Sequence, residues 1–324
     1  MRQFKTILKI TVSLLLLWIV FRRIDWPSII LIGKQIEFIW LIPLIGLFPL
    51  GIYISSLRWY LILQELEVEI NLQNIFRIVW SSAFLNTCLP GSTGGDLYRF
   101  IYIRKCSSNK TVQITSSLII DRFFGLVSLL AIGIFSLFLA DPTTLKIFTN
   151  LNYSIHQNIK YISIIIFALV LLLSLGFKLL VSFNKVVAFI KNIISQICGI
   201  FYNIILIFNI SLCSVFIHIL TLSTSYFISR AIGLNIPFFD LAIFITILAI
   251  VITIPISVNG LGLREALLFG FLQLHGYKCG YSFGIKESAL AYSLLGLTCD
   301  ICRVLPGGIF LVLSKDRTIS DLKS

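Results

Sequence analysis

The sequence has 324 residues, of which 58% are hydrophobic and 12% are charged, and its mean hydropathy is +0.99. Soluble domains carry about 25% charged residues, so this composition excludes a soluble enzyme or binding domain and indicates an integral membrane protein. The formal net charge is +12. No basic stripe with interleaved aromatic side chains lies outside the apolar segments, so we expect anionic membrane lipids, and not nucleic acid, as the partner of this charge.

The seven cysteines are scattered, mostly within apolar segments, which is typical of small buried side chains and not of a disulfide framework. Cys299 and Cys302 have the spacing of a redox or metal pair. They fall inside an expected membrane span, however, and no second pair accompanies them. We therefore predict neither a metal nor a cofactor.

The first apolar segment in chain order, residues 10–20, follows three cationic residues. Charge before an apolar stretch is also typical of a signal peptide, but no small-residue cleavage site follows, so we predict a retained span. Residues 38–57 predict the second span. Trp40 and Trp59 flank that span, and we expect both side chains at the membrane interface.

The next apolar segment, residues 75–104, is interrupted by Leu89-Pro90-Gly91-Ser92-Thr93-Gly94-Gly95-Asp96-Leu97-Tyr98-Arg99. Pro and Gly stop helices, and Gly lets backbone groups approach a ligand closely. At membrane depth, non-helical backbone is tolerated only where protein buries it or where it lines a wet cavity. The interruption therefore predicts the tip of a re-entrant hairpin beside a polar cavity, with an exposed loop between two spans as the alternative.

Four further spans are predicted at residues 112–140, 159–183, 203–229 and 288–313. Between the last two, the apolar segment 238–275 contains Pro255-Ile256-Ser257-Val258-Asn259-Gly260-Leu261-Gly262-Leu263-Arg264-Glu265 at its centre. Its two arms have only about 16 to 20 residues each, which predicts a second hairpin or a broken pair of helices. The expected fold is an all-α integral membrane protein with six full transmembrane helices and two re-entrant helical hairpins.

The loops on the side of the N-terminus, with Arg58 counted among them, carry roughly twice as many Lys and Arg residues as the opposite loops, which predicts cytoplasmic N- and C-termini. The two hairpins then enter from opposite sides. Each tip contains Pro, Ser, Gly, an acid and an Arg, and a span with a central Asp and Arg follows each. We therefore predict one membrane domain over residues 1–324, with inverted repeat halves at about 38–140 and 203–313. Chance recurrence of such pairs is the alternative.

Charged side chains inside the expected spans must pair or face water, because exposure to lipid costs several kcal/mol. Asp300 and Arg303 are three residues apart and share a helix face. Asp121 and Arg122 are adjacent and point apart, so we expect each to take a partner from the hairpin arms. Such pairs serve either a polar lipid site or, alternatively, only the attachment of one helix to another.

The predicted lipid- or headgroup-binding residues are those of the two tips and the charges of the spans that follow. They are Pro90, Gly91, Gly94, Gly95, Asp96, Arg99, Asp121, Arg122, Asn259, Gly260, Gly262, Arg264, Glu265, Asp300 and Arg303. We expect Arg99 and Arg264 to hold a phosphate, since guanidinium groups form bidentate charge-assisted bonds. The three acids Asp96, Asp121 and Asp300 would balance that charge or accept a cationic headgroup.

Several motifs occur in order along nearly the whole chain: Arg58-Trp59, Phe84-Leu85-Asn86, Leu89-Pro90-Gly91, Gly94-Gly95-Asp96, Arg99, Asp121-Arg122-Phe123-Phe124-Gly125 and Gly260-Leu261-Gly262-Leu263-Arg264-Glu265. Together they resemble the transmembrane region of lysylphosphatidylglycerol synthases, a flippase-like family that also exists as stand-alone proteins. The resemblance implies movement of an aminoacylated or otherwise modified lipid between the leaflets of a bacterial-type cytoplasmic membrane. Ser92-Thr93 departs from the family's bulky residue or Arg at this place, which leaves the headgroup preference open.

Three functions follow as hypotheses. The first is a lipid flippase or transporter, and the second is a membrane glycosyltransferase acting on a polyprenyl-phosphate lipid. The third is a non-catalytic membrane partner of a separately encoded lipid-modifying enzyme. For the chain's partners, we expect either a homo-oligomer or such an enzyme. The full synthases carry a soluble transferase domain after the membrane region, and this chain ends at Ser324, so we expect no lysyl transfer. Because the sequence has no Asp-x-Asp pair and its three histidines are isolated, we predict no catalytic residues. A metal-independent enzyme that uses Asp96 or Asp121 is the alternative.

Overall fold

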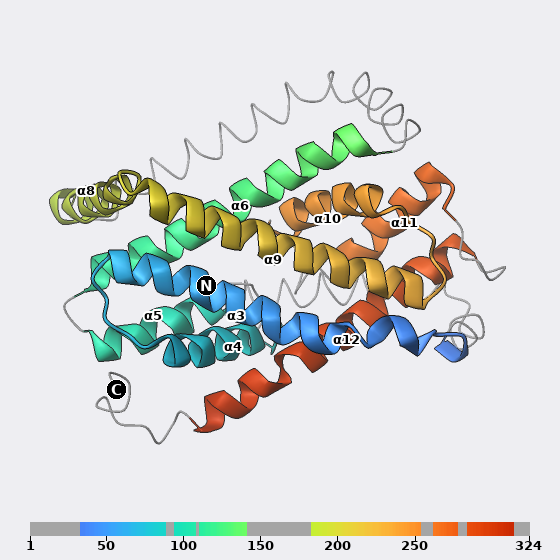
Figure 1. The fold of residues 1–324 in the computed structure, drawn as a ribbon, viewed down its shortest axis with the longest axis horizontal. Helices are drawn as coiled ribbons and strands as arrows, with labels where there is room; N and C mark the ends of the chain where they lie inside the picture. The colour runs from blue at the N-terminus through green and yellow to red at the C-terminus, as the bar shows by residue number, and fades with distance from the viewer. Residues whose placement is uncertain are drawn as a thin grey trace.

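The computed structural model describes residues 33–88, 94–107, 110–140, 183–253, 262–277 and 284–313. Helices make up these ranges apart from short connections, which confirms the prediction of an all-α fold (Figure 1). They are the 3₁₀ helix η1 (Phe38–Leu41) and the α-helices α3 (Leu44–Glu65), α4 (Leu72–Cys88), α5 (Gly94–Cys106), α6 (Thr111–Leu139), α8 (Phe183–Ile200), α9 (Ile204–Ala231), α10 (Phe238–Thr253), α11 (Leu263–His275) and α12 (Ile285–Leu313).

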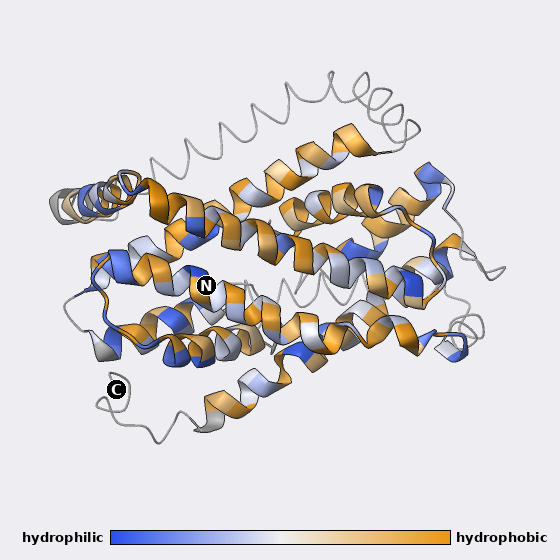
Figure 2. Ribbon diagram, in the orientation of Figure 1, coloured by the Kyte–Doolittle hydropathy of each residue, from blue (hydrophilic) through white to orange (hydrophobic). Residues whose placement is uncertain are grey.

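Four stretches in the described ranges are long and apolar enough to cross a membrane: Phe38–Glu65, Thr111–Leu139, Ile204–Ala231 and Ile285–Leu311. They confirm four of the predicted spans as helices of sufficient length. The predicted span at 10–20 and nearly all of the span at 159–183 lie outside the described residues. Large apolar side chains are exposed on these helices, among them Phe135 and Phe138 of α6 and Phe208 of α9. Figure 2 shows that most of α6 and α9 is coloured as hydrophobic. Such surfaces are expected where a helix faces lipid.

Two pairs of shorter helices stand at the positions of the predicted hairpins. α4 packs against α5, and α10 packs against α11, while the tips at residues 89–93 and 254–261 lie outside the described residues. The four helices have 17, 13, 16 and 13 residues. A membrane-spanning helix needs about 20 residues. Arms of this length agree with the prediction that each hairpin enters the membrane without crossing it.

The helices α3–α6 and α9–α12 form two sets in the same order, a long helix, two short helices and a long helix. The two sets exchange contacts, because α4 packs against α12 while α10 packs against α6, and α3 lies along α9. Reciprocal contacts of this kind are expected from an approximate two-fold relation between two halves. The arrangement is consistent with the predicted repeat, whose boundaries stay a prediction.

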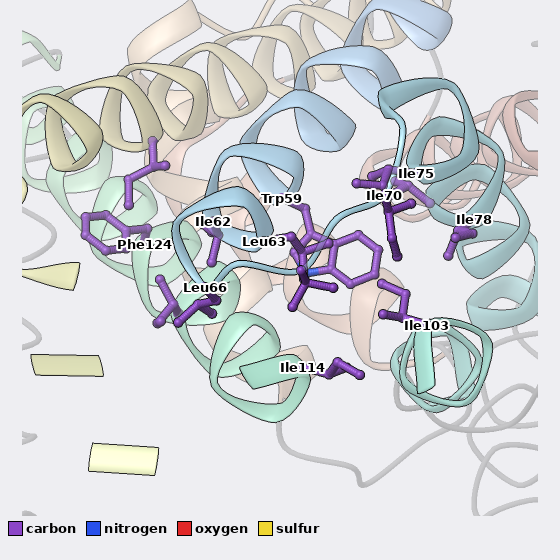
Figure 3. Close-up of a cluster of buried hydrophobic side chains, with 14 of the residues drawn as sticks. Trp59, Ile62, Leu63, Leu66, Ile70, Ile75, Ile78, Ile103, Ile114 and Phe124 are labelled. Carbon is purple, nitrogen blue, oxygen red and sulfur yellow. The ribbon is translucent and has the colours of Figure 1, made fainter. Parts of the chain in front are cut away.

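The described helices form two buried apolar cores, one centred on each set of helices. In the first core, one fully buried side chain comes from each of α3, α4, α5 and α6, namely Trp59, Ile75, Ile103 and Ile114 (Figure 3). The second core takes side chains from α9 to α12, among them Ile228, Leu241, Leu268 and Tyr292. Helices of the other set take part in each core, since Leu206 and Ile210 of α9 belong to the first core and Leu44 of α3 belongs to the second. Each hairpin is therefore held by apolar packing against helices of both sets.

Hydrogen bonds reinforce the contact between α4 and α12. The indole Nε1 of Trp80 donates to the carbonyl oxygen of Arg303 (2.8 Å), and Oγ of Ser81 donates to the carbonyl oxygen of Gly307 (3.1 Å). These acceptors lie on either side of Pro306, which lacks a backbone N–H and interrupts the bonding pattern within α12. The span that carries Asp300 is thereby fixed against the first arm of the other set's hairpin.

The helix α3 extends beyond the predicted second span, and two expectations at its end are wrong. Arg58 does not lie in a loop and Trp59 does not lie at the membrane interface, because α3 continues to Glu65 and both side chains are buried. The indole Nε1 of Trp59 donates to Oγ of Ser117 on α6 (3.2 Å). Buried polar groups are tolerated when they find partners. Arg58 therefore no longer counts among the loop charges that predict the orientation.

Candidate functional site

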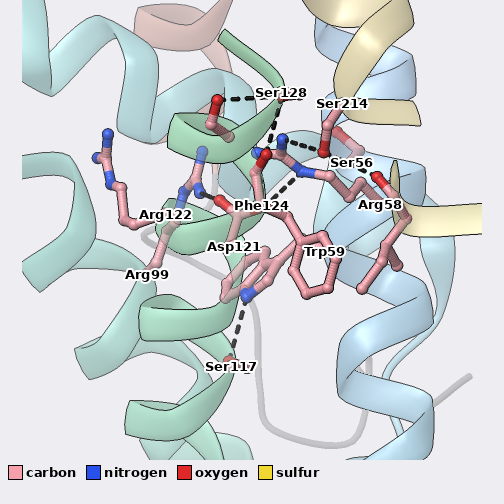
Figure 4. A network of polar contacts seen from close by, with 12 residues as sticks. Ser56, Arg58, Trp59, Arg99, Ser117, Asp121, Arg122, Phe124, Ser128 and Ser214 are labelled. Atoms are coloured by element: carbon pink, nitrogen blue, oxygen red, sulfur yellow. Dashed lines mark hydrogen bonds and ion pairs between the residues drawn. The ribbon is translucent and has the colours of Figure 1, made fainter. Parts of the chain in front are cut away.

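A buried cluster of charges, which we call the first polar cluster, joins Arg58 of α3, Arg99 of α5 and Asp121 of α6 (Figure 4). Nε and Nη2 of Arg58 lie 2.8 and 2.7 Å from Oδ1 of Asp121, and Nη1 of Arg99 lies 3.4 Å from Oδ2. All three side chains are buried. One carboxylate therefore pairs with two guanidinium groups that come from two other helices.

Further contacts extend the first polar cluster to two more helices. Nη1 of Arg58 donates to Oγ of Ser214 on α9 (2.9 Å), and Nε of Arg99 donates to Oγ of Ser82 on α4 (2.8 Å). The guanidinium carbon of Arg99 also lies 5.1 Å from the ring centre of Trp59, a favourable cation–π distance. The cluster thus connects the first hairpin to α3, α6 and α9.

A second ion pair links α5 to α6 at the surface. Nη2 and Nε of Arg122 lie 2.6 and 3.0 Å from Oδ2 of Asp96, and the two side chains are 59% and 25% exposed. Oδ1 of Asp96 is buried and accepts no hydrogen bond from the residues that the structure describes. The prediction that Asp121 and Arg122 diverge and take partners from a hairpin arm is confirmed, since Arg99 and Asp96 both belong to α5.

Gly95 lets α5 approach α4 closely enough for these pairs to form. Its backbone N–H donates to Oδ1 of Asn86 (2.7 Å). A Cβ at this position would overlap the carbonyl oxygen of Ser82 and lie 2.7 Å from Cγ of Asn86. A residue with a side chain would therefore push α5 away from α4, and Asp96 and Arg99 would move with it.

The second polar cluster consists of Arg264 at the start of α11 with Asp300 and Arg303 of α12. Nη1 of Arg264 lies 3.8 Å from Oδ2 of Asp300, and Nη2 of Arg303 lies 3.2 Å from Oδ1, so Asp300 and Arg303 share a face as predicted. The three side chains are 20%, 37% and 36% exposed in the order Arg264, Asp300 and Arg303. Nε of each Arg is buried without a hydrogen-bond partner in the described structure.

Glu265, the neighbour of Arg264, has both carboxylate oxygens occupied. Oε2 accepts from the backbone N–H of Gly262, and Oε1 accepts from Oγ of Ser293 on α12, each at 2.6 Å. Gly262 precedes the helix with φ +83°, a conformation that glycine adopts readily. The first turn of α11 is thus capped by Glu265 and attached to α12, which directs Arg264 toward Asp300.

The predicted site residues form two groups in the structure. Asp96, Arg99, Asp121 and Arg122 come together around α5 and α6, and Gly94 and Gly95 begin α5. The second group is Gly262, Arg264, Glu265, Asp300 and Arg303. Pro90, Gly91, Asn259 and Gly260 lie outside the described residues. No ion pair that the structure resolves joins the two groups, so Arg99 and Arg264 belong to separate clusters.

Sequence reasoning missed Arg58 and three serines as members of these clusters. Arg58 belongs to a motif of the resemblance but was assigned to a loop, although a lone cation beside an apolar run could have marked it as buried and paired. Ser82 and Ser214 gave no signal, because serine is common in membrane helices. Ser293 lies seven residues before Asp300, and this spacing places both on one helix face.

The two clusters differ in what they leave available for a ligand. In the first, both oxygens of the central carboxylate and two nitrogens of Arg99 have partners. In the second, two guanidinium groups again share one carboxylate, but the side chains are partly exposed and the Nε donors of both arginines have no partner among the described residues. The second cluster is therefore suited to an anion. Among the described residues, no group of three or more His, Cys, Asp and Glu is placed to hold a metal ion.

A comparison with protein families matched residues 6–294 to the family described as "Lysylphosphatidylglycerol synthase TM region". The matched part contains both hairpins and all of the first polar cluster, and it ends before Asp300. No curated protein and no solved structure matched the chain. Since the match covers far more than half of its length, the chain is an integral membrane protein that belongs to the family of lysylphosphatidylglycerol synthase transmembrane regions.

Proposed function

We propose that the protein is a lipid flippase that moves an anionic or aminoacylated phospholipid, or a similar lipid-linked substrate, across the cytoplasmic membrane. The observation that carries this proposal is the second polar cluster, with two partly exposed arginines, one carboxylate and two unused Nε donors. A phosphate diester carries one negative charge, and its oxygens would accept from these guanidinium groups. Membership of a family of lipid-synthase membrane regions supports a lipid as the substrate.

The proposal assigns the phosphate to Arg264 and Arg303 and not to Arg99. Arg99 is buried and already donates to Asp121 and Ser82, so a phosphate could reach it only by displacing these partners. Arg264 and Arg303 retain donors and partial exposure. We therefore give Arg99 a structural role in holding the first hairpin.

A cationic headgroup would find its best acceptor at Asp96. Both oxygens of Asp121 are bonded to arginines, and each oxygen of Asp300 lies within 4 Å of a guanidinium nitrogen. Among the described residues, Asp96 is the one of these three acids that keeps a buried oxygen without a hydrogen bond. An ammonium group of an aminoacylated lipid would provide the donor that this oxygen lacks.

The proposed function also implies an orientation in the membrane and a set of partners. We propose that both termini lie in the cytoplasm and that the two repeat halves form one membrane domain around the transport path. Membrane lipids, anionic ones above all, are the proposed partners, with a second copy of the chain or a separate lipid-modifying enzyme as additional partners. The exposed apolar side chains of α6 and α9 support contact with the lipid bilayer.

Arg264→Lys should weaken the binding of an anionic lipid. A lysine ammonium is a point charge and cannot reproduce the planar donors of a guanidinium beside Asp300. We expect the dissociation constant for fluorescent phosphatidylglycerol in detergent to rise roughly ten-fold, which corresponds to about 1.4 kcal/mol. Arg104→Lys, at an exposed position near the end of α5, is the matched control and should bind as the wild type does.

Equal affinity of wild type, Arg264→Lys and Arg104→Lys would contradict the assignment of the phosphate to Arg264. The same preparation tests the glycosyltransferase hypothesis. We would incubate the wild type with polyprenyl-phosphate lipid and sugar donors and analyse the lipids by mass spectrometry. A new glycolipid that Asp96→Asn fails to produce would favour an enzyme over a flippase.

A further inference from the structure

The second polar cluster is built along one face of α12. Ser293, Gly296, Asp300 and Arg303 follow one another at intervals of three, four and three residues, which places them on the same side of the helix. Ser293 donates to Glu265, and Asp300 pairs with Arg264. Two residues of this face, Ser293 and Asp300, therefore contact the first turn of α11, and Gly296 lies between them.

The guanidinium group of Arg264 packs against Gly296, which has no side chain. A Cβ on Gly296 would overlap Nη2 of Arg264 and would lie 3.3 Å from its Cζ and 3.7 Å from its Nη1. The planar group thus occupies the space that any side chain at position 296 would fill. Apart from the neighbours of Gly296 in the chain and the backbone of α12 itself, these are the three atoms of the described residues nearest to that Cβ position.

We propose that Gly296 is a positioning residue for the lipid phosphate site, an inference that rests on the proposed function. The absence of a side chain lets the Arg264 guanidinium settle against α12, within reach of Asp300 and with Nε left for a ligand. An added methyl group would meet the far end of a flexible side chain and not a backbone segment. It would therefore displace the guanidinium while the Glu265–Ser293 attachment of the two helices remains.

Gly296→Ala separates this role from a purely structural one. Alanine is the better helix former, so the thermal midpoint of the purified protein should stay at or above that of the wild type. Lipid binding should move in the opposite direction, because the displaced guanidinium no longer meets the phosphate. A glycine that served only helix packing would lose stability and binding together.

The test is a double-mutant cycle with fluorescent phosphatidylglycerol in detergent. Gly296→Ala should raise the dissociation constant about five-fold or more in the wild-type background and leave it unchanged in the Arg264→Ala background, because coupled residues are not additive. Gly270→Ala is the matched control, since a Cβ at this helical position of α11 meets no atom within 4 Å. It should bind as the wild type does.

The outcomes distinguish this inference from the proposed function. If Arg264→Ala weakens binding but Gly296→Ala does not, the phosphate site stands and the positioning role of Gly296 is overturned. If Gly296→Ala weakens binding equally in the Arg264→Ala background, Gly296 acts by another route and the inference is also overturned. If Arg264→Ala binds as tightly as the wild type, the phosphate site itself is wrong.

Discussion

Asp121→Asn should lower the free energy of unfolding by about 3–5 kcal/mol, because removing one member of a buried ion pair leaves an uncompensated charge. Here the loss affects two cations, since Arg58 and Arg99 both pair with the same carboxylate. Asparagine has nearly the same shape and keeps one acceptor, so the change removes charge without opening a cavity. Denaturant titration in detergent, followed by the fluorescence of buried Trp59 and the other tryptophans, measures the effect.

The matched control for this prediction is Asp96→Asn. It makes the same chemical change in the pair with Arg122, whose side chain is 59% exposed. Exposed pairs contribute about 1 kcal/mol or less, so this variant should remain close to the wild type in stability. Equal stability of the two variants would contradict the role that we assign to the first polar cluster. The fraction of Asp121→Asn that stays folded should still bind phosphatidylglycerol, since Arg264 belongs to the other cluster.

Gly95→Val should abolish lipid movement in a protein that still inserts into the membrane. A Cβ at this position would overlap the carbonyl oxygen of Ser82, and a backbone carbonyl cannot rotate away as a side chain can. α5 must then shift from α4, which separates Arg99 from Ser82 and Asp121. Overpacking of this kind costs about 1–3 kcal/mol. The loss of function is expected from the close contact between α5 and α4, since Gly95 lies in the helix α5.

Gly46→Val provides the control for the glycine substitution. Gly46 belongs to α3, and a Cβ there meets no atom within 4 Å. Both variants add the same β-branched side chain to a helix, so any difference between them reflects the contact with Ser82. The measurement is the rate of lipid movement in vesicles, with the monodisperse yield after solubilisation as the measure of insertion. Wild-type activity in Gly95→Val would show that the close approach of α4 and α5 is unnecessary.

The helices of this fold follow from the sequence because apolar length and Gly/Pro interruptions are local features. The span at Ile285–Leu311 and the short arms of both hairpins correspond to such features. The end of α3 does not, because the partner of Arg58 is Asp121, which lies 63 positions away. A charged residue whose partner cannot be identified from the sequence indicates the end of a membrane helix. For this reason the sequence places the end of the second span before Arg58, whereas α3 continues to Glu65.

The sequence predicts those contacts of the candidate site that join residues close together in the chain, and it does not predict those that join distant residues. The Asp300–Arg303 pair follows from helical spacing alone. For Asp121 the sequence predicts the kind of partner, a hairpin arm, but not that Arg58 would be the closer of its two cations. The space beside Gly296 depends on how α11 lies on α12, and no spacing rule contains that information.

We expect the protein to move lipid between the leaflets and Arg264 to bind the lipid's phosphate during this movement. Purified protein in vesicles of phosphatidylcholine with a trace of fluorescent phosphatidylglycerol tests it directly, with an impermeant quencher reporting the share of label in the outer leaflet. The wild type should expose the inner-leaflet label within minutes, while Arg264→Ala should remain close to protein-free vesicles. Protein-free rates in wild-type vesicles, or wild-type rates with Arg264→Ala, would contradict the account.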